Sequence, residues 1–350
     1  MRKISPGYVM SSARCAVTRD SSARCALART GERARGPEKA LARGTATAAR
    51  SRVHRRYRVD EVIATGGMAR IHVGRRRSDR HRVALKVFVP PAGAERRFLD
   101  YMVHEAKALR AAASPAVVTL LDHGLWLGRP TLVLEWLEGR TLAETIAASG
   151  PLPLDRVEHV MRQLLAAVAT LHARGVVHAD LKPENVMLCP HAGGERVRIF
   201  DLGAAHVDGV GVVARDEVFG TPGYVAPELV DGGAVSASTD VYALGVLLYE
   251  LLAGQPPFPG AELDDVVHQQ TRQRLPRPSA VRGGGEISDA LDALVATAMA
   301  PWPSRRFPDV AIMRTAFEAA ITVTARTGAD DARVPAETTD APTLRCKRSA

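Results

Sequence analysis

The spacing of apolar positions predicts strands in the first part of the chain. Short runs rich in Val, Ile and Leu, separated by turns that contain glycine or proline, predict strands within 57–76, 81–89, 117–125 and 130–139. Between them, apolar residues recur every three or four positions and predict one amphipathic helix over 94–112, with Phe98, Met102, Ala106 and Leu109 on its buried face. The first part is therefore expected to be a small sheet with a single helix.

Helical spacing dominates the second part. A long periodic stretch runs from residue 154 to Gly175, and glycine in that place is typical of a helix C-terminus. The run VYALGVLLYELLAG (241–254) is almost entirely apolar and short, which favours a buried core helix over a membrane span. Further helices are expected at 261–272, 288–299 and 308–321, and short strands at 185–188 and 197–200. The pattern predicts an α+β fold, in which EWLEG (135–139) joins a small β-rich lobe to a larger, mainly helical lobe.

Composition separates the ends of the chain from this folded unit. Residues 1–56 carry 14 Lys and Arg against three acidic residues and few large apolar side chains, so disorder is expected there. This segment is either a basic arm for nucleic acid or anionic lipid, or a low-complexity tail, or sequence upstream of the true translation start. The rest of the chain has 33 basic and 35 acidic residues, which gives no support to nucleic-acid binding by the folded part. Residues 322–350 lose the periodicity and are expected to be a flexible tail, which leaves 57–321 as the folded domain.

Targeting and redox signals point to a reduced, cytoplasmic protein. The start MRKISPGYVM lacks the apolar stretch of a secretory signal, and no uninterrupted apolar run reaches the length of about 18 residues that a membrane span needs. The cysteines form neither a CxxC pair nor a metal-like spacing with histidine; they are Cys15, Cys25, Cys189 and Cys346.

Four separated segments carry groups suited to phosphoryl transfer. ATGGMARIHVG (64–74) is a glycine turn between strands, whose backbone could lie over phosphates. Lys86 in VALKV offers a cation, and HADLKPEN (178–185) offers a carboxylate, a cation and an amide on one loop. Asp201 in IFDLGAA places a carboxylate at a strand end. Phosphoryl transfer requires groups that hold the polyphosphate, oxygen ligands for magnesium and a carboxylate that orients the attacking hydroxyl.

In order and spacing, these segments resemble the protein kinase superfamily, most closely the bacterial, eukaryotic-like (Hanks-type) Ser/Thr kinases. GTPGYVAPEL (220–229) is similar to the family's substrate-positioning loop, and STDVYALGVLLYELLAGQPPF (238–258) to the helix that follows it. PSRRF supplies Arg306, which the resemblance pairs with Glu228. The resemblance implies ATP and Mg²⁺ as cofactors and a bilobal kinase fold, with an N-lobe at 57–134, a hinge at 135–138 and a C-lobe at 139–321.

The resemblance also assigns catalytic roles. Asp180 would orient the substrate hydroxyl and accept its proton, and Lys182 would neutralise the transferring phosphoryl group. Thr221 would contact both side chains and position the substrate. Asn185 and Asp201 would be the magnesium ligands.

Nucleotide binding is assigned in the same way. Lys86 would hold the α- and β-phosphates, and Glu105 of the predicted helix would hold Lys86. The backbone carbonyl of Glu135 and the amide of Leu137 would bind adenine. The other implied nucleotide contacts are Ile63, Ala64, Thr65, Gly66, Gly67 and Met68 in the glycine loop, Ile71, Ala84 and Met187 around the ring, and Leu134 as gatekeeper.

The glycine loop departs from the pattern of the family. Ala64 and Ala69 stand at the first and third glycine positions of G-x-G-x-x-G, while Gly66 keeps the second. Each alanine adds one methyl group and removes backbone freedom. We therefore expect weaker nucleotide affinity or slower turnover, with activity retained. Leu202 replaces the usual Phe after the metal-binding Asp and keeps an apolar side chain there.

The residue before the catalytic aspartate departs in a more informative way. Ala179 stands where the family carries an Arg that binds a phosphorylated activation loop. Residues 204–220 of that loop contain no Ser, Thr or Tyr. The arginine that would bind the phosphate and a hydroxyl in 204–220 that would carry it are thus both absent. Our hypothesis is that activation-loop phosphorylation is not the switch, and that the loop is ordered constitutively or by a regulatory partner protein.

Three functions compete on this pattern. The leading one is a Ser/Thr protein kinase that acts on protein substrates, since D-x-K-x-x-N and G-T-P-x-Y favour Ser/Thr over Tyr specificity. The alternative is a pseudokinase, a nucleotide-binding signalling scaffold, which the alanines at positions 64, 69 and 179 motivate and the intact Lys86, Asp180 and Asp201 oppose. A small-molecule kinase of the aminoglycoside phosphotransferase type is disfavoured by GTPGYVAPE, which builds a platform for protein substrates.

Overall fold

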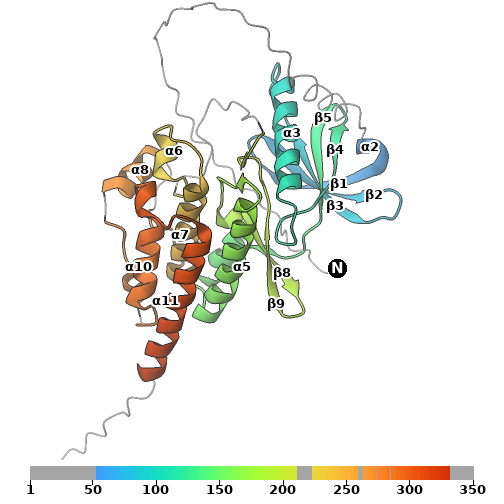
Figure 1. The fold of residues 1–350 in the computed structure, drawn as a ribbon. Coiled ribbons are helices and arrows are strands. Elements are labelled where there is room, and N and C mark those ends of the chain that lie inside the picture. The colour runs from blue at the N-terminus through green and yellow to red at the C-terminus, as the bar shows by residue number, and fades with distance from the viewer. Residues whose placement is uncertain (1–52, 211–222, 259–262, 273, 284, 332–350) are drawn as a thin grey trace, which may run out of the picture.

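The structure, a computed structural model, describes residues 53–210, 223–258, 263–272, 274–283 and 285–331. It has the expected two lobes (Figure 1), one built on a β-sheet and one built mainly of helices. The predicted α+β bilobal fold is therefore confirmed. No helix in these described ranges is long and apolar enough to cross a membrane.

The first lobe is a five-stranded antiparallel sheet in the order β1-β2-β3-β5-β4. Successive side chains of a strand point to opposite faces of the sheet, and β3 and β5 are buried on both faces along most of their length. The strands are β1 (Tyr57–Thr65), β2 (Ala69–Arg76), β3 (Arg82–Phe88), β4 (Leu120–Trp126) and β5 (Arg129–Glu135).

Helix α3 (Glu95–Ala111) covers one face of the sheet. Its predicted apolar stripe is buried, but the helix also buries His104 and Glu105, which are 7% and 2% exposed. Two adjacent polar side chains are costly to bury without partners. Their partners, described below, connect this lobe to the site.

A short helix, α2 (Val53–Arg56), covers the opposite face of the sheet, so the lobe has a second helix besides the predicted one. Val53 is completely buried against strands of that face, and Arg56 forms an ion pair with Asp122 of β4 at 2.9 Å. The prediction of disorder up to residue 56 is therefore wrong for 53–56, because one buried valine and one ion pair fix the segment. Residues 1–52 lie outside the described residues.

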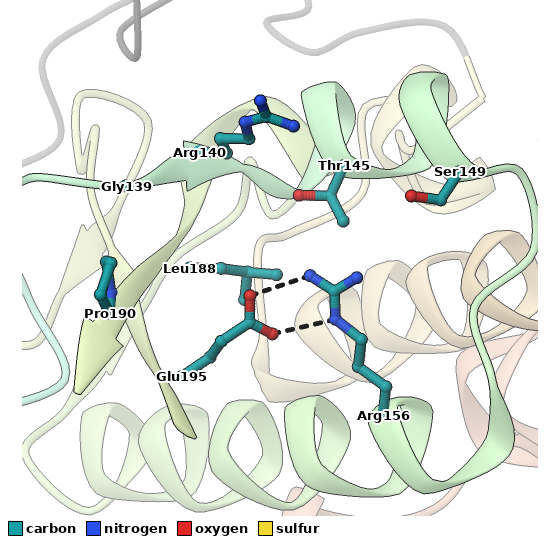
Figure 2. A pocket seen from close by; sticks show the side chains of 8 residues that line it. All are labelled: Gly139, Arg140, Thr145, Ser149, Arg156, Leu188, Pro190 and Glu195. Carbon is teal, nitrogen blue, oxygen red and sulfur yellow. Dashed lines mark hydrogen bonds and ion pairs between the residues drawn. The ribbon is translucent and has the colours of Figure 1, made fainter. Parts of the chain in front are cut away.

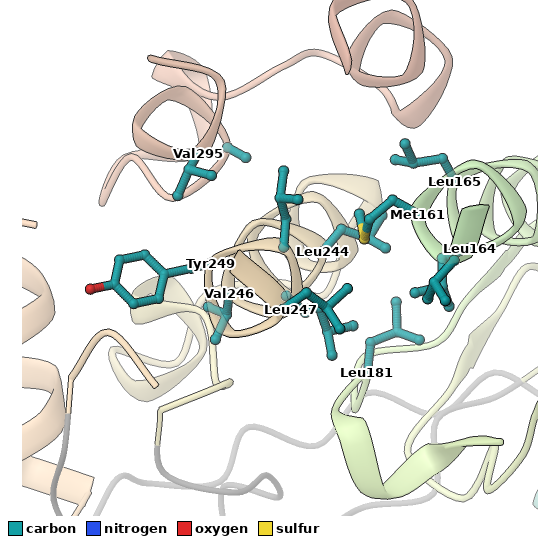
Figure 3. Close-up of a cluster of buried hydrophobic side chains, with 14 of the residues drawn as sticks. Met161, Leu164, Leu165, Leu181, Leu244, Val246, Leu247, Tyr249 and Val295 are labelled. Carbon is teal, nitrogen blue, oxygen red and sulfur yellow. The ribbon is translucent and has the colours of Figure 1, made fainter. Parts of the chain in front are cut away.

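The helical lobe packs around α7 (Ala237–Ala253), which is buried on nearly every side, as its apolar run predicts. Figure 3 shows Met161, Leu164 and Leu165 of α5 meeting Leu244 and Leu247 of α7. The other helices are α4 (Leu142–Ser149), α5 (Leu154–His172), α6 (Pro227–Val230), α8 (Leu263–Arg272), α9 (Pro278–Arg282), α10 (Asp289–Ala298) and α11 (Val310–Asp331).

Helix α11 continues to Asp331, ten residues beyond the predicted domain end at 321. Thr324 is buried, and its hydroxyl lies 2.6 Å from that of Ser288, which caps α10. The prediction of a flexible tail is therefore wrong for 322–331. Threonines made this stretch look aperiodic, although one of them faces the core. Residues 332–350 lie outside the described residues.

Short strands and turns of the helical lobe precede or contain the predicted chemical groups. Strands β8 (Val186–His191) and β9 (Gly194–Ile199) form a hairpin, which β6 (Arg140–Thr141) extends. Strand β7 (Val176–Val177) pairs with β10 (His206–Val207), and the helical turns η1 (Pro183–Asn185) and η2 (Pro303–Arg305) complete the lobe.

Candidate active site

Lys86 lies on β3, in the middle of the sheet, and alternation decides where its side chain points. Val83, Leu85 and Val87 face the side covered by α2, whereas Ala84 and Phe88 face the side of α3. Lys86 shares the second face. The ammonium group is thereby directed away from the outer face and toward the region between the lobes.

The ammonium of Lys86 joins both lobes through two carboxylates. Its Nζ lies 2.8 Å from both carboxylate oxygens of Glu105 and 2.7 Å from Oδ1 of Asp201. Burial acts to lower the pKa of Lys86, but the carboxylates of Asp201 and Glu105 more than offset it and raise this pKa above its ordinary value. Burial conversely acts to raise the pKa of Asp201, and the charge of Lys86 lowers it. Both groups are therefore charged at neutral pH.

Asp180, Lys182 and Asn185 converge on one short loop. Lys182 Nζ lies 3.0 Å from Asp180 Oδ2, and Asn185 Nδ2 donates to the Asp180 carbonyl at 2.8 Å and to Oδ2 at 3.1 Å. Burial acts to lower the pKa of Lys182, and the Asp180 carboxylate raises it overall. Leu181 is buried in the core beside α5 and α7 (Figure 3), which anchors the two charged residues on either side of it.

Asp240, at the start of α7, fixes the backbone of this loop through hydrogen bonds. Its carboxylate is completely buried and accepts hydrogen bonds from the amides of His178 and Ala179, at 2.8 and 2.9 Å. The imidazole Nε2 of His172 lies 2.8 Å from the same carboxylate. Ala179 has a φ of 62°, a left-handed conformation that costs a non-glycine residue about 1–2 kcal/mol. The buried carboxylate thus maintains a strained backbone directly before Asp180.

The two predicted magnesium ligands have donor sets that suit the ion. Asn185 uses its Nδ2 toward Asp180, which leaves the amide oxygen for a metal. Asp201 has one oxygen on Lys86, which leaves the second. Within the described ranges, no group of three or more His, Cys, Asp and Glu could hold a metal. Mg²⁺ typically takes one or two carboxylates and completes its shell with substrate phosphates and water, so two oxygen ligands fit.

The residues expected around the nucleotide base come together in one apolar cluster. Ala84 pairs with Leu134 across β3 and β5, and the two belong to the same cluster as Ile71, Leu137 and Met187, with Ile63, Ala64 and Met68 packed at its edge. In the glycine turn, the Gly66 amide donates to the Ala69 carbonyl at 2.9 Å, which makes a tight turn. Thr65 ends β1 immediately before this turn and Gly67 follows Gly66.

The hinge is held by contacts that sequence patterns did not indicate. The Glu135 amide donates to the Thr119 carbonyl at 3.0 Å, and the Glu135 side chain accepts from the Thr119 amide at 2.5 Å. Arg198 of β9 forms an ion pair with the same carboxylate. Both partners come from segments distant in sequence, so residue spacing contains no signal for them.

Two further sequence expectations have different outcomes. The predicted Arg306–Glu228 pair is present: Nη1 and Nη2 of the guanidinium donate to the two carboxylate oxygens at 2.8 and 2.6 Å. Thr221 and residues 211–220 of the activation loop lie outside the described residues. The placement predicted for Thr221 beside Asp180 stays a prediction.

A hollow lies beside the β8–β9 hairpin (Figure 2). It has a volume of about 270 Å³, and Arg156 and Glu195 form a bidentate ion pair within it, at 2.9 and 2.8 Å. Arg140, Thr145 and Leu188 also line it. Of the predicted catalytic and nucleotide-binding residues that the structure describes, none lines this hollow.

This chain is similar in sequence to known protein kinases. A sequence model of the protein kinase domain matches residues 57–317. Serine/threonine-protein kinase PknL of Mycobacterium tuberculosis is 36% identical over 266 residues, which are 75% of this chain and 65% of PknL. Serine/threonine-protein kinase PknB of Mycobacterium leprae is 33% identical over 265 residues, 74% of this chain and 42% of PknB.

The match to PknB of Mycobacterium tuberculosis is closely similar, at 34% identity over 266 residues, 74% of this chain and 42% of that protein. The chain thus spans somewhat less than two thirds of the length of PknL and less than half that of PknB. The domain match covers most of the chain and includes both lobes, the hinge and the charged loop. The chain therefore belongs to the protein kinase domain family.

Proposed function

We propose that this protein is a Ser/Thr protein kinase, which transfers the γ-phosphate of ATP to hydroxyl groups of protein substrates in the presence of Mg²⁺. The observation that carries the proposal is the assembled charge network, in which Lys86 contacts both Glu105 and Asp201. In kinases this lysine–glutamate pair and the metal-binding aspartate must both be in place for transfer. The similarity to proteins named serine/threonine-protein kinases supports the choice of substrate hydroxyl.

Each residue of the network has a distinct task in the proposed reaction. Asp180 orients the substrate hydroxyl and takes up its proton, while the Lys182 ammonium beside it balances the charge that develops on the phosphoryl group. Lys86 fixes the α- and β-phosphates. Asn185 and Asp201 would hold the Mg²⁺, which supplies charge neutralisation on the phosphates when bound.

The nucleotide base and the substrate are held by the remaining predicted residues. The apolar cluster of Ala84, Ile71 and Met187 encloses the adenine ring, beside the backbone groups of Glu135 and Leu137. Burial of an aromatic ring between apolar side chains is the usual source of affinity in such sites. Thr221 positions the incoming hydroxyl against Asp180.

We infer further that this kinase does not need a phosphorylated activation loop. The methyl group of Ala179 offers no charge to a phosphate, and residues 204–220 have no hydroxyl to carry one. Lys86, Glu105 and Asp201 are nevertheless in contact. Contacts within the protein, or a partner protein, would then supply the order that phosphate supplies elsewhere.

The proposed activity is tested with purified protein, MgATP and a generic basic protein as acceptor. We expect transfer of the γ-phosphate to serine and threonine, and its loss in Asp180→Asn, which keeps the shape of the side chain and removes its charge. Nucleotide binding without transfer in the wild type would instead support the signalling scaffold. The matched control is Asp155→Asn, because Asp155 lies in the first turn of α5, in the helical lobe and apart from the catalytic loop.

A further inference from the structure

His104 of α3 makes a contact that none of the roles above explains. Its Nε2 lies 2.8 Å from the backbone carbonyl oxygen of Ala205, 101 residues later in the chain. A carbonyl oxygen only accepts, so Nε2 carries the proton and donates. The imidazole is 7% exposed and Ala205 is 3% exposed. This is therefore a buried hydrogen bond between α3 and the first residues of the activation segment, which begins at Asp201.

The same stretch of the activation segment touches α3 at a second point. A Cβ atom added to Gly203 would lie 3.3 Å from Glu105 Oε2 and 3.1 Å from Asp201 Oδ1. Leu202 and Ala205 belong to the apolar cluster that contains the buried face of α3. His104 and Glu105 are consecutive residues on one turn of α3. The Glu105 side chain contacts Lys86, and the His104 side chain contacts the activation segment.

The activation segment in turn contacts the catalytic loop. Directly after Ala205, strand β10 pairs with β7, with His206 opposite Val177. Strand β7 ends one residue before His178, the start of the catalytic loop. The Asp208 amide also donates to the Gly175 carbonyl at 2.9 Å. The hydrogen bond of His104 and the backbone from Ala205 into β10 thus connect α3 to the strand that precedes Asp180.

We propose that His104 is a positioning residue: it fixes the start of the activation segment to α3 and so keeps Lys86, Glu105 and Asp201 assembled without a phosphate on the loop. The inference deepens the proposed kinase function and rests on it. The chemistry explains the choice of histidine. A buried carbonyl oxygen needs a donor, and the His104 imidazole reaches the Ala205 carbonyl from the helix and supplies one.

The test compares three substitutions of His104 with a control on the same helix. Gln places an amide nitrogen about as far from Cα as Nε2 of histidine, whereas Asn is one carbon shorter and Leu has no donor. We expect His104→Gln to stay within about twofold of the wild type. His104→Asn and His104→Leu should raise the KM for ATP and lower kcat/KM about tenfold, the change that corresponds to ~1.4 kcal/mol. Lys107→Leu, on the same helix, serves as the control.

The KM for the peptide substrate separates positioning from general loss of structure. Loosening of α3 and Asp201 weakens the grip on nucleotide, so the KM for ATP should respond and the KM for peptide should not. The inference is overturned if His104→Leu matches the wild type, or if Gln and Asn behave alike. Should His104→Leu not fold, the Gln and Asn pair decides alone.

A readout without catalysis keeps this inference distinguishable from the proposed function. Amide hydrogen exchange of residues 203–208 should accelerate in His104→Asn and His104→Leu and stay unchanged in His104→Gln. If the wild type transfers no phosphate yet shows this exchange pattern, the kinase proposal fails while the positioning contact stands. Equal exchange in all variants, with an active wild type, overturns the contact and leaves the kinase proposal intact.

Discussion

Replacement of Asp240 by Asn should damage catalysis through the backbone of Ala179. The Asp240 carboxylate accepts three hydrogen bonds: from His178 and His172 on one oxygen and from Ala179 on the other. Asn keeps the shape but offers a single acceptor oxygen. That oxygen should remain where it satisfies two donors. The new NH₂ group then faces the Ala179 amide, and two donors oppose each other.

The expected loss of kcat follows from two quantities: the hydrogen bond between the Ala179 amide and Asp240, which is lost, and the backbone strain of Ala179, which this bond offsets. A hydrogen bond to a charged group contributes about 1.5–3 kcal/mol, and the left-handed backbone of Ala179, with φ of 62°, costs about 1–2 kcal/mol. Without its acceptor, Ala179 should relax and move Asp180. At ~1.4 kcal/mol per tenfold, we expect kcat to fall by about ten- to a hundredfold.

The assay is steady-state peptide phosphorylation, with melting temperatures measured in parallel to show that each variant is folded. Glycine adopts the left-handed region without strain, so Ala179→Gly added to Asp240→Asn should recover about five- to tenfold of the lost kcat, equivalent to ~1–1.4 kcal/mol. Ala179→Gly alone should remain close to the wild type. If kcat of Asp240→Asn stays within threefold, or if glycine brings no recovery, the strained backbone is not what positions Asp180.

Three further predictions concern stability. Arg306→Met leaves the largely buried Glu228 carboxylate without a partner, so the free energy of unfolding in urea should fall by about 3–5 kcal/mol; an unchanged midpoint would refute this. In Lys86→Met, the positive charge that lowers the pKa of Asp201 is gone, and burial should then raise this pKa. Asp201 therefore takes up a proton more readily as the pH falls, which removes the unpaired buried charge. The loss of stability relative to the wild type should therefore be larger at pH ~7.5 than at pH ~5, and equal losses would contradict it. Val53→Ala opens a cavity under α2 and should lower the free energy of unfolding by about 1–3 kcal/mol, measured by heat or urea. An unchanged stability would show that α2 is not docked on the sheet.

The sequence was most informative where local pattern and chemistry coincide. Alternation in VALKV placed Lys86 on a strand, and helical spacing placed Glu105 on the helix that follows. The Lys86 ammonium lies 2.8 Å from the Glu105 carboxylate, although the two residues are 19 positions apart in the sequence. The spacing of apolar residues does not predict this contact. It followed from the resemblance to kinases, as did the pair of Glu228 and Arg306.

Contacts that depend on one side chain meeting a distant backbone atom were not predictable. In the sequence, His104 is a polar residue beside the apolar stripe of its helix. No neighbouring residue indicates that its side chain contacts the carbonyl oxygen of Ala205. The docking of α2 was missed for a related reason. Composition averages over a segment, and a single buried Val53 within an arginine-rich stretch does not change the average.

The most direct test of the account is the activity of protein that carries no phosphate. The purified chain is treated with phosphatase, intact mass confirms that it is unmodified, and initial rates of peptide phosphorylation are measured while phosphosites are mapped over time. The account predicts full initial rates from the first turnover, with no acceleration as phosphate accumulates. A lag that ends as Thr221 becomes phosphorylated would contradict it.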